Sequence, residues 1–528
     1  MKYIGIDLGT TYSCIATLDD FDGAQPRALD VKGRNTTPSV VWFPDGKPVV
    51  VGDNAKRHLG PDAKSTVAFA KREMVVDENN DVVKRWNING AEYNPVDISG
   101  MILKYLYDAF LDTSKEEHKV VITCPANYNL AQRELVRAAA VKAGINTEDS
   151  KTFRIINEPT AAAISYVMES PERRGNIVVF DLGGGTLDVT ALFFDKDAKQ
   201  SAKSADGSSD SSSIPRINVI DSQGLPYLGG ADWDKVVQEE IVRQLGENGV
   251  TDITDKMRDS MITMSEQAKI DLTDSDLELY GMSIGNEDLE FNYTQSQFEA
   301  DTEHLLKNAL DQIEVVINNF DSRRALIGED IPADILGIVL VGGSSHMPQV
   351  KKGIEARFPQ FVGKIMISDP SQAIARGAAY YCKMMGSDEG AGPTDLMPMT
   401  IGTDVSVNRE PFCFNMIYWK DPIPCKKEFH FTLPGNNPRV SNKIFTNSCK
   451  NPGANAPPTA HYCSIEECKI LGEFDVVLST PGSPGDDVLV IIEVDIGGIM
   501  TCHAECNGEV GDARLELKGG VGKILASQ

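Results

Sequence analysis

The chain has 528 residues, of which 41% are hydrophobic, 24% are charged and 7% are aromatic. This length exceeds one ordinary hydrophobic core, so we expect about two to four domains. The formal net charge of −26 excludes electrostatic binding of nucleic acid, which requires clustered lysine and arginine. Since the N-terminus lacks a secretory apolar core and no run of about 18 apolar residues occurs, we expect a cytoplasmic protein without a membrane partner.

The long first part of the chain alternates strand and helix patterns, as in an α/β fold. A serine-rich stretch within it, Ser201–Ser213, is expected to form a flexible loop. The glycine turn at the end of the strand-like run GIVLVGG (337–343) is followed by a helix pattern. The strands are predicted at the N-terminal alternation MKYIGID and at the runs VVITCPA (120–126), NIVVFDL (176–182) and GIVLVGG (337–343).

One helix of this part carries signals at both of its ends. It is predicted from Leu130 to Ala143, with Asn129 as its N-cap and Gln132 at the capping-box position. Gly144 is the predicted stop, because glycine readily takes the left-handed conformation that ends a helix. The α/β pattern therefore includes at least one helix with well-defined bounds.

The pattern changes at Gly386–Pro393, which is the predicted domain boundary. After it, short strand-like runs are separated by Gly, Pro and Asn, as in an antiparallel sandwich. The predicted strands are FCFNMIYW (412–419), KEFHFTL (427–433), EFDVVLS (473–479), DVLVIIEVDI (487–496) and MTCHAEC (500–506).

Cysteine is concentrated in this second part. Neither of its closely spaced pairs has the C-x₂-C spacing of a common zinc knuckle, and no histidines complete such a pattern. Buried free thiols are therefore favoured over a metal site, which stays open. Of ten cysteines, the seven that follow residue 410 are Cys413, Cys425, Cys449, Cys463, Cys468, Cys502 and Cys506.

A short pattern occurs twice in the first part. Residues 6–12 read IDLGTTY and residues 180–188 read FDLGGGTLD. Each copy is a strand followed by Asp, Leu, a glycine-rich turn and Thr. A single copy is compatible with a plain tight hairpin, whereas two copies in matching context predict two related halves that face each other across a cleft.

The residue types of the repeat indicate a phosphate site. Glycine turns expose backbone N–H groups to an anion, and Thr10, Thr11 and Thr186 add hydroxyl donors. Carboxylates beside a triphosphate need a cation between them, so Asp7 and Asp181 are predicted to anchor hydrated Mg²⁺. The third glycine turn, 341–344, suits ribose or phosphate at a helix start, although a plain strand-to-helix turn remains an alternative. A Walker loop is absent from the sequence.

Together these residues resemble the seventy-kilodalton heat-shock chaperone family of the DnaK type. The resemblance is strong over 1–385 and weaker over 398–515, where YWKDPIPCKKEFHFTL and LGEFDVVLSTPGSP are similar to strands of the family's peptide-binding β-sandwich. The matching segments are IGIDLGTTYSC (4–14), RNTTPS (34–39), RIINEPTAAAISY (154–166), FDLGGGTLDVT (180–190), LGGADWD (228–234) and LVGGSS (340–345).

The resemblance implies an architecture of two folded parts. The first is an actin-like, sugar-kinase-like α/β domain of two lobes, built from duplicated ribonuclease-H-like halves, that binds nucleotide over 1–385. A linker follows over 386–397. The second part is a mainly antiparallel β-sandwich over 398–515 that is similar to a peptide-binding domain, and 516–528 is a C-terminal tail.

The resemblance also implies roles for individual residues. Lys71 matches the lysine that orients the attacking water, and Glu158 matches a residue that touches the water shell of Mg²⁺ and senses nucleotide. Asp188 would complete the acidic ring with Asp7 and Asp181. The remaining catalytic residues would be Thr10 and Thr186. Relay of the nucleotide state would involve Pro125, Arg133 and Pro159.

The implied cofactors are ATP or ADP with Mg²⁺, with K⁺ as a further candidate ion. Metal contacts, mainly through bound water, fall to Asp7, Asp181 and Glu158. The nucleotide would be held by Gly9, Thr10, Thr11, Tyr12, Gly183, Gly184, Gly185, Thr186, Gly229, Gly230, Glu266, Lys269, Thr273, Gly342, Gly343, Ser344 and His346.

The sequence departs from the family pattern at several places. The two arginines that stack on adenine are replaced by Ile270 and His346, which predicts weaker or less selective binding of the base. The linker keeps only Leu396, Met397 and Met399 as apolar residues, so coupling between the two parts is expected to be weak. The stretch 446–468 is an insertion rich in Pro, Asn and Cys, and the chain stops where the family's helical lid would begin.

The leading hypothesis is therefore an ATP-dependent chaperone of the stress-response type, in which slow ATP hydrolysis alters binding of extended, unfolded polypeptide. Candidate partners are a J-domain co-chaperone and a nucleotide-exchange factor. A nucleotide-gated co-chaperone or binding module with negligible turnover is the first alternative. A small-molecule sugar kinase of the same superfold is the second.

Overall fold

The computed structural model describes residues 1–21, 23–77, 81–149, 151–198, 215–284, 287–367, 369, 371–385, 393–433, 435–453, 456–495 and 500–515. The predicted loop Ser201–Ser213, most of the predicted linker and the predicted tail 516–528 lie outside these residues. The chain divides into two compact units: the first comprises 1–75, 83–127 and 139–392, and the second comprises 76–82, 128–138 and 393–528. The change of unit after residue 392 falls inside the predicted linker.

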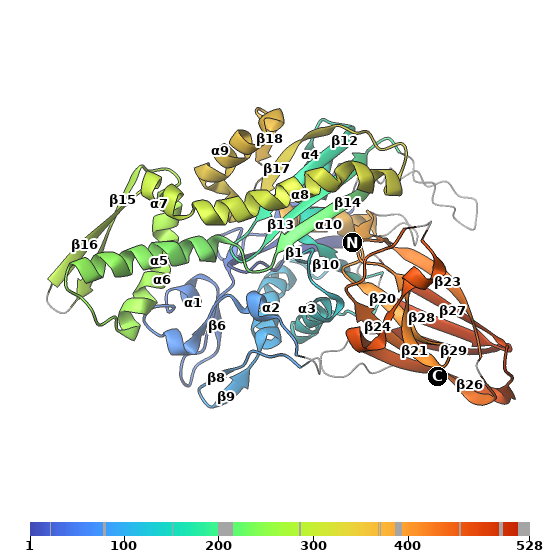
Figure 1. The fold of residues 1–528 in the computed structure, drawn as a ribbon. Coiled ribbons are helices and arrows are strands. Elements are labelled where there is room, and N and C mark those ends of the chain that lie inside the picture. Colours follow the sequence, from blue (N-terminus) through green and yellow to red (C-terminus); the bar gives the residue numbers. More distant parts are fainter. Residues whose placement is uncertain are drawn as a thin grey trace. The chain divides into compact units, whose positions relative to one another are not determined.

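The first unit contains two sheets with the same topology (Figure 1). In each sheet, the central strand pairs antiparallel with the next strand of that sheet along the chain and parallel with a later strand. One further strand then pairs with each of these two neighbours, so that five strands of each sheet lie in the same order. One sheet has the order β11-β10-β1-β2-β3, from Phe153–Asn157, His118–Cys124, Lys2–Asp7, Tyr12–Asp19 and Arg27–Ala28. The other has the order β14-β13-β12-β17-β18, from Arg216–Leu225, Leu187–Asp195, Arg174–Leu182, Ile335–Val341 and Ile365–Ile367.

This shared topology supports the prediction of two related halves. Equivalent strands β1 and β12 both end in the Asp-containing turns of the sequence repeat. Since the strand order is the same, each turn leaves its sheet at the same corner. The repeat read from sequence therefore corresponds to a repeat of structure.

Two helices of the first unit pack against each other and against the two sheets. α10 (Ala373–Met384) contacts β1 and β2, and α4 (Glu158–Glu169) contacts β12 and β13. A Cβ atom on Gly377 of α10 would lie 1.7 Å from the carbonyl oxygen of Ala161, so glycine permits this close helix contact. The other helices of the unit are α1 (Asp53–Lys56), α2 (Pro95–Thr113), α5 (Gly230–Glu247), α6 (Asp255–Asp271), α7 (Gln295–Asp301), α8 (Glu303–Ile327) and α9 (Pro348–Arg357).

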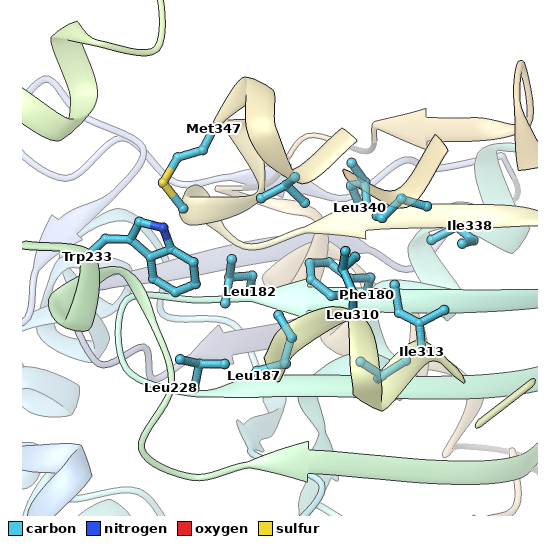
Figure 2. Close-up of a cluster of buried hydrophobic side chains, with 14 of the residues drawn as sticks. Phe180, Leu182, Leu187, Leu228, Trp233, Leu310, Ile313, Ile338, Leu340 and Met347 are labelled. Atoms are coloured by element: carbon cyan, nitrogen blue, oxygen red, sulfur yellow. The ribbon is translucent and has the colours of Figure 1, made fainter. Parts of the chain in front are cut away.

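The second sheet rests on a large hydrophobic cluster. Phe180 and Leu182 of β12 and Leu340 of β17 meet Leu310 and Ile313 of α8, and Figure 2 shows Trp233 and Met347 at one end of the cluster. Figure 1 shows α8 lying along β13 and β14, which it contacts. Because the strand residues just before the glycine turn are fully buried, the turn is anchored on a rigid base.

The second unit is built from antiparallel strands in two main sheets. Both sheets contribute to one hydrophobic core, with Ile401, Ile444 and Val476 from one sheet and Val490 and Ala504 from the other. The first sheet has the order β25-β21-β20-β24-β26, from Tyr462–Ser464, Glu410–Ile417, Thr400–Val407, Asn437–Asn447 and Lys469–Gly482. The second has the order β23-β27-β28-β29, from Cys425–Thr432, Asp487–Val494, Met500–Cys506 and Glu509–Leu515.

Several element predictions are confirmed. The helix predicted over 130–143 is α3 (Leu130–Lys142), with reciprocal bonds between Asn129 and Gln132 at its start. Gly144 takes the left-handed conformation at its end, with φ of +83°. The five strands predicted after the boundary correspond to β21, β23, β26, β27 and β28, whereas β20, β24 and β29 were not predicted. In the part of the chain that the structure describes, none of the helices has the length and hydropathy to span a bilayer.

Candidate functional site

The first unit contains a cavity of about 310 Å³ at the corner where its glycine turns meet. It is lined by turns from both sheets and by one face of α6. Most residues predicted from sequence lie on its wall: Asp7, Gly9, Thr10, Thr11, Tyr12, Lys71, Glu158, Asp181, Gly183, Gly184, Thr186, Glu266, Lys269, Thr273, Gly342, Gly343 and Ser344. The roles given to them stay predictions, and the geometry indicates what each could do.

The two repeated turns are packed directly against each other. A Cβ on Gly184 would lie 1.9 Å from Oγ1 of Thr11, and a Cβ on Gly185 would lie 2.6 Å from Cγ2 of Thr10. The second turn is closed by the N–H of Gly183, which donates to the carbonyl oxygen of Thr186 at 3.0 Å. Glycine is therefore required here because threonine side chains of the opposite turn occupy the space that a side chain would need.

Two further loops brace the second turn. The N–H of Gly230, at the start of α5, donates to the carbonyl oxygen of Gly183 at 2.9 Å, and the hydroxyl of Ser344 donates to the same oxygen at 3.0 Å. A Cβ on Gly229 would lie 2.5 Å from the nitrogen of Gly185. Gly342 has φ of +80°, which favours glycine. Gly185, Gly229 and Gly230 support the wall of the cavity without lining it.

A buried cation lies between the two turns. Lys71, on the 3₁₀ turn η2 (Ala70–Glu73), forms an ion pair with Glu158 at the start of α4, and both side chains are less than 10% exposed. Burial alone would lower the pKa of Lys71, but the carboxylates of Glu158 and Asp7 outweigh burial and raise the pKa. Lys71 is therefore a charged lysine held at the wall of the cavity.

The neighbouring Arg72 was missed by the sequence interpretation. Its Nε donates to the carbonyl oxygen of Gly185 at 2.9 Å, and its guanidinium pairs with Asp232 of α5 at 2.5 Å. It thus ties the η2 segment, which carries Lys71, to the second glycine turn. The only feature of the sequence that could have indicated a role for Arg72 is its position next to Lys71.

Three aspartates lie near this cation, of which Asp181 and Asp188 are buried and Asp7 is half-buried. Burial and then repulsion by Glu158 raise the pKa of Asp7 to about 7 and the pKa of Asp188 to about 8, and the same causes raise the pKa of Asp181. Oδ2 of Asp181 and Oδ1 of Asp188 have no hydrogen-bond partner within the described parts of the chain. Asp7 accepts from the hydroxyl of Thr123 at 3.1 Å.

This acidic set fits a hydrated divalent cation. Carboxylates that share one buried pocket favour a bound cation, because it replaces the protons that they would otherwise retain. Among the residues that the structure describes, these carboxylates do not form a group whose ligand oxygens all lie within 4.8 Å of one another. That spacing suits Mg²⁺ held mainly through water. Asp188 lies on β13 behind the turn and does not line the cavity.

The opposite end of the cavity is lined by α6. Lys269 forms an ion pair with Asp234 at 2.7 Å, and Glu266 forms an ion pair with Lys56 of α1 at 2.6 Å. Ile270 lines the cavity and is 47% exposed. At position 270 this end therefore presents an aliphatic surface where the family pattern has an arginine, as the sequence predicted.

His346 is not brought into the cavity. It is exposed on η3 (Gly343–His346), and the next residue, Met347, lines the cavity instead. Four lining residues, Thr36, Met347, Ser371 and Ile374, were not predicted as site residues. Thr36 belongs to a segment that the resemblance had matched, but the other three carried no motif signal.

The three residues predicted to relay the nucleotide state lie outside the cavity. Pro159 is the second residue of α4, directly after Glu158, and it is buried. Pro125 follows β10 and is buried. Arg133 is buried on α3, where its Nε donates to the carbonyl oxygen of Tyr128 at 3.1 Å. Their relay role stays a prediction.

Comparison with known proteins identifies the family. The family described as "Hsp70 protein" matches residues 3–523. The chain is 32% identical over 538 residues to the chaperone protein DnaK of Thermotoga neapolitana, covering 98% of this chain and 80% of that protein. It is 31% identical over 519 residues to the chaperone protein DnaK of Mycoplasmopsis agalactiae, covering 95% of this chain and 76% of that protein.

The two alternatives, a co-chaperone module without turnover and a sugar kinase, are not favoured by these similarities. The match extends through both units rather than through the nucleotide cavity alone. The chain therefore belongs to the Hsp70 family of ATP-dependent molecular chaperones, which are ATPases.

Proposed function

We propose that the cavity of the first unit, an actin-like domain of two lobes, binds ATP or ADP with Mg²⁺ and slowly hydrolyses ATP. We further propose that the sandwich unit binds extended polypeptide. The observation that carries the first proposal is the packing of Gly184 against Thr11 and of Gly185 against Thr10. It brings two sets of backbone N–H groups to one point, which suits the β- and γ-phosphates.

The residues at this point have separable tasks. The N–H groups and hydroxyls of the two turns bind and orient the phosphates. Lys71, held by Glu158, directs a water molecule toward the γ-phosphate and balances charge that develops there. Mg²⁺, held through water by Asp7, Asp181 and Glu158, would neutralise phosphate charge. K⁺ stays a prediction from the resemblance.

The second unit offers a cavity of about 1070 Å³ for a polypeptide. Its wall combines backbone-rich strands and apolar side chains from β20, β23 and β24, including Val405, Phe431 and Val440. An extended apolar segment could pair with strand edges and insert alternate side chains there. A J-domain co-chaperone, a nucleotide-exchange factor and a cytoplasmic location remain part of the proposal.

ATP turnover by the full chain tests the proposed catalytic role. We expect Mg²⁺-dependent hydrolysis that Lys71→Ala lowers by about 100-fold or more, the usual effect of losing a charge-stabilising group. Nucleotide binding should persist in this variant. Lys47→Ala, at an exposed loop lysine, is the matched control. Equal turnover in Lys71→Ala and the parent protein would reject the assignment.

Coupling between nucleotide and polypeptide needs a separate measurement. Affinity for a fluorescent model peptide should differ between ATP-bound and ADP-bound protein, with a small ratio if the linker couples weakly. Equal affinities would reject coupling, while the turnover result would be unaffected. Absence of peptide binding in both states would reject the polypeptide proposal itself.

A further inference from the structure

Three cysteine thiols converge in the second unit, at the Pro-, Asn- and Cys-rich insertion 446–468 and the strand beside it. Cys413 lies on β21, Cys463 on β25 and Cys468 directly after the 3₁₀ turn η6 (Ile465–Glu467). Their sulfur atoms all lie within 4.8 Å of one another. Cys413 and Cys463 are opposite each other in the β21–β25 pairing, and the sulfurs of Cys463 and Cys468 are 3.6 Å apart.

A fourth cysteine stands beside this group. Cys449 follows β24, and its thiol contacts that of Cys463. Its backbone N–H donates to Oδ1 of Asn447 at 2.9 Å, which turns the chain toward the cluster. The four residues are separated by up to 55 positions in the sequence, as the numbers 413 and 468 show, so only the fold brings them together.

The spacing matches a thiolate-bound metal. Four sulfurs in a tetrahedron around Zn²⁺, each at about 2.3 Å from the metal, are about 3.8 Å from one another. The distance between Cys463 and Cys468 is close to that value. A disulfide would require about 2.05 Å, and Cys413, Cys449, Cys463 and Cys468 form no disulfide.

The polar surroundings also suit thiolates. Nδ2 of Asn447 lies within hydrogen-bonding distance of three of the sulfurs, at 3.4 Å from Cys463, 3.6 Å from Cys468 and 3.7 Å from Cys413. The orientation of this amide is held by its further bond to Oδ1 of Asn415 at 2.7 Å. Side-chain donors of this kind orient metal ligands and stabilise their negative charge.

Packing by itself gives no reason for this arrangement. Cys502 and Cys506, on β28, lie in the hydrophobic core, as expected of cysteines that act as small apolar residues. Cys449, Cys463 and Cys468 are instead half-buried and adjacent to polar amides. Thiols are weak hydrogen-bond donors, so clustering three of them contributes little, whereas a soft cation would bind all of them strongly.

We propose that Cys413, Cys449, Cys463 and Cys468 bind one Zn²⁺ as a structural site. The ion joins β21 to the segment between β24 and β26, which is the Pro-, Asn- and Cys-rich insertion. That segment contains only the short elements η5 (Pro458–His461), β25 and η6 among its described residues. Elements this short cannot form a hydrophobic core of their own, so a bound metal would stabilise the segment instead.

Metal content of the full chain tests the site. Protein purified with a thiol reductant, loaded with Zn²⁺ and freed of excess metal should retain one zinc per chain by mass spectrometry. Cys463→Ser and Cys468→Ser should each retain less than one fifth of that amount. Cys425→Ser is the matched control, because Cys425 is a half-buried cysteine of the same unit outside the cluster, and it should retain the full amount.

Co²⁺ substitution gives a second readout that needs no variant. Tetrahedral thiolate ligation should give intense visible bands and a sulfur-to-metal charge-transfer band, both abolished by one equivalent of added Zn²⁺. Absence of these bands together with absence of retained zinc would overturn the proposal. A mass lower by two hydrogens with two fewer titratable thiols would also overturn it, in favour of a Cys463–Cys468 disulfide.

The zinc site also bears on the proposed polypeptide site. Tyr462, Ile465 and Cys468 line the cavity of the second unit, so zinc removal should lower peptide affinity. This consequence rests on the proposed function. Retained zinc without peptide binding would reject the polypeptide proposal alone, and peptide binding by protein that retains no zinc after loading would reject the metal site alone.

Discussion

The two ends of the nucleotide cavity differ in how closely their residues are constrained. At the phosphate end, Gly184 and Gly185 have no space for a methyl group, and Lys71 is enclosed by carboxylates. At the opposite end, Ile270 is half-exposed and His346 does not line the cavity. Under the proposed function, binding of phosphate depends on backbone geometry, whereas binding of the base depends on replaceable side chains.

This difference explains why the sequence departs from the family at one end only. Any side chain at position 184 meets the opposite turn, so substitution there disrupts both halves of the first unit. A side chain at position 270 extends toward solvent and can change without altering the fold. The tightness of packing therefore predicts that substitutions at the phosphate end lower nucleotide affinity more than substitutions at the opposite end.

The largest effect is expected from Gly184→Ala. Its Cβ would lie 1.9 Å from Oγ1 of Thr11, so the turns must separate. We expect nucleotide affinity to fall about 5- to 150-fold, the ratio that corresponds to an overpacking cost of ~1–3 kcal/mol. Isothermal calorimetry would measure it. Gly246→Ala, in an open position on α5, is the control and should bind nucleotide with the affinity of the parent protein. Unchanged nucleotide affinity in Gly184→Ala would refute the proposal that close packing of the two turns is needed for binding.

A second prediction concerns pH and the phosphate end alone. The folded-state pKa values of Asp7 and Asp188, about 7 and about 8, lie above the ordinary value of 3.8. The nucleotide-free folded protein therefore binds more protons than the unfolded chain between roughly pH 4 and 8, so its stability falls as pH rises through that window. We expect Tm to fall accordingly, and Mg²⁺ with ADP to reduce the fall.

Asp188→Asn isolates this effect, because it removes the titration while keeping the shape of the side chain. The variant should match the parent near pH 4 and exceed it in Tm near pH 8, without nucleotide. Asp45→Asn, at an exposed loop position, is the control and should follow the parent at every pH. If the parent protein instead became more stable than Asp188→Asn as the pH rises from about 4 to about 8, the assigned direction of the Asp188 pKa shift would be wrong.

A smaller effect is expected at the base end from Ile270→Arg. An arginine there could stack on adenine, which adds about 1 kcal/mol, or about fivefold in ATP affinity. Fluorescent-nucleotide titration would detect it, and affinity for inorganic phosphate ligands should not change. Leu326→Arg, at an exposed position on helix α8, adds the same charge far from the cavity. An equal gain from both variants would indicate a charge effect rather than stacking.

The smallest effect is expected from Lys56→Ala. Lys56 pairs with Glu266 at 2.6 Å and donates to the hydroxyl of Tyr12 at 2.8 Å, joining α1 to α6 at the cavity. Both charged groups are partly exposed, so the pair contributes ~0.2–1 kcal/mol. We expect nucleotide release to accelerate by about fivefold or less in stopped-flow measurements. A much larger acceleration would mean that the base end is as constrained as the phosphate end.

Local sequence patterns were sufficient for much of the fold. The ends of α3 followed from Asn129, Gln132 and Gly144, because capping depends on residues a few positions apart. Strand β20 was missed because its alternation is weak, and β24 because asparagine and proline interrupt its start. Arg72 and Met347 were missed because nothing local distinguishes them, and their significance comes from partners or cavity walls distant in sequence.

The sequence by itself determined the repeated turn and its acidic residues. Glycine, threonine and aspartate at that spacing indicate a phosphate and cation site without any information from distant parts of the chain. The tertiary structure decided which threonine faces which glycine, which residue of the third turn lines the cavity, and that the three cysteines Cys413, Cys463 and Cys468 meet. These are contacts between segments far apart in the chain. Strand pairing and core packing determine them, and no local pattern encodes them.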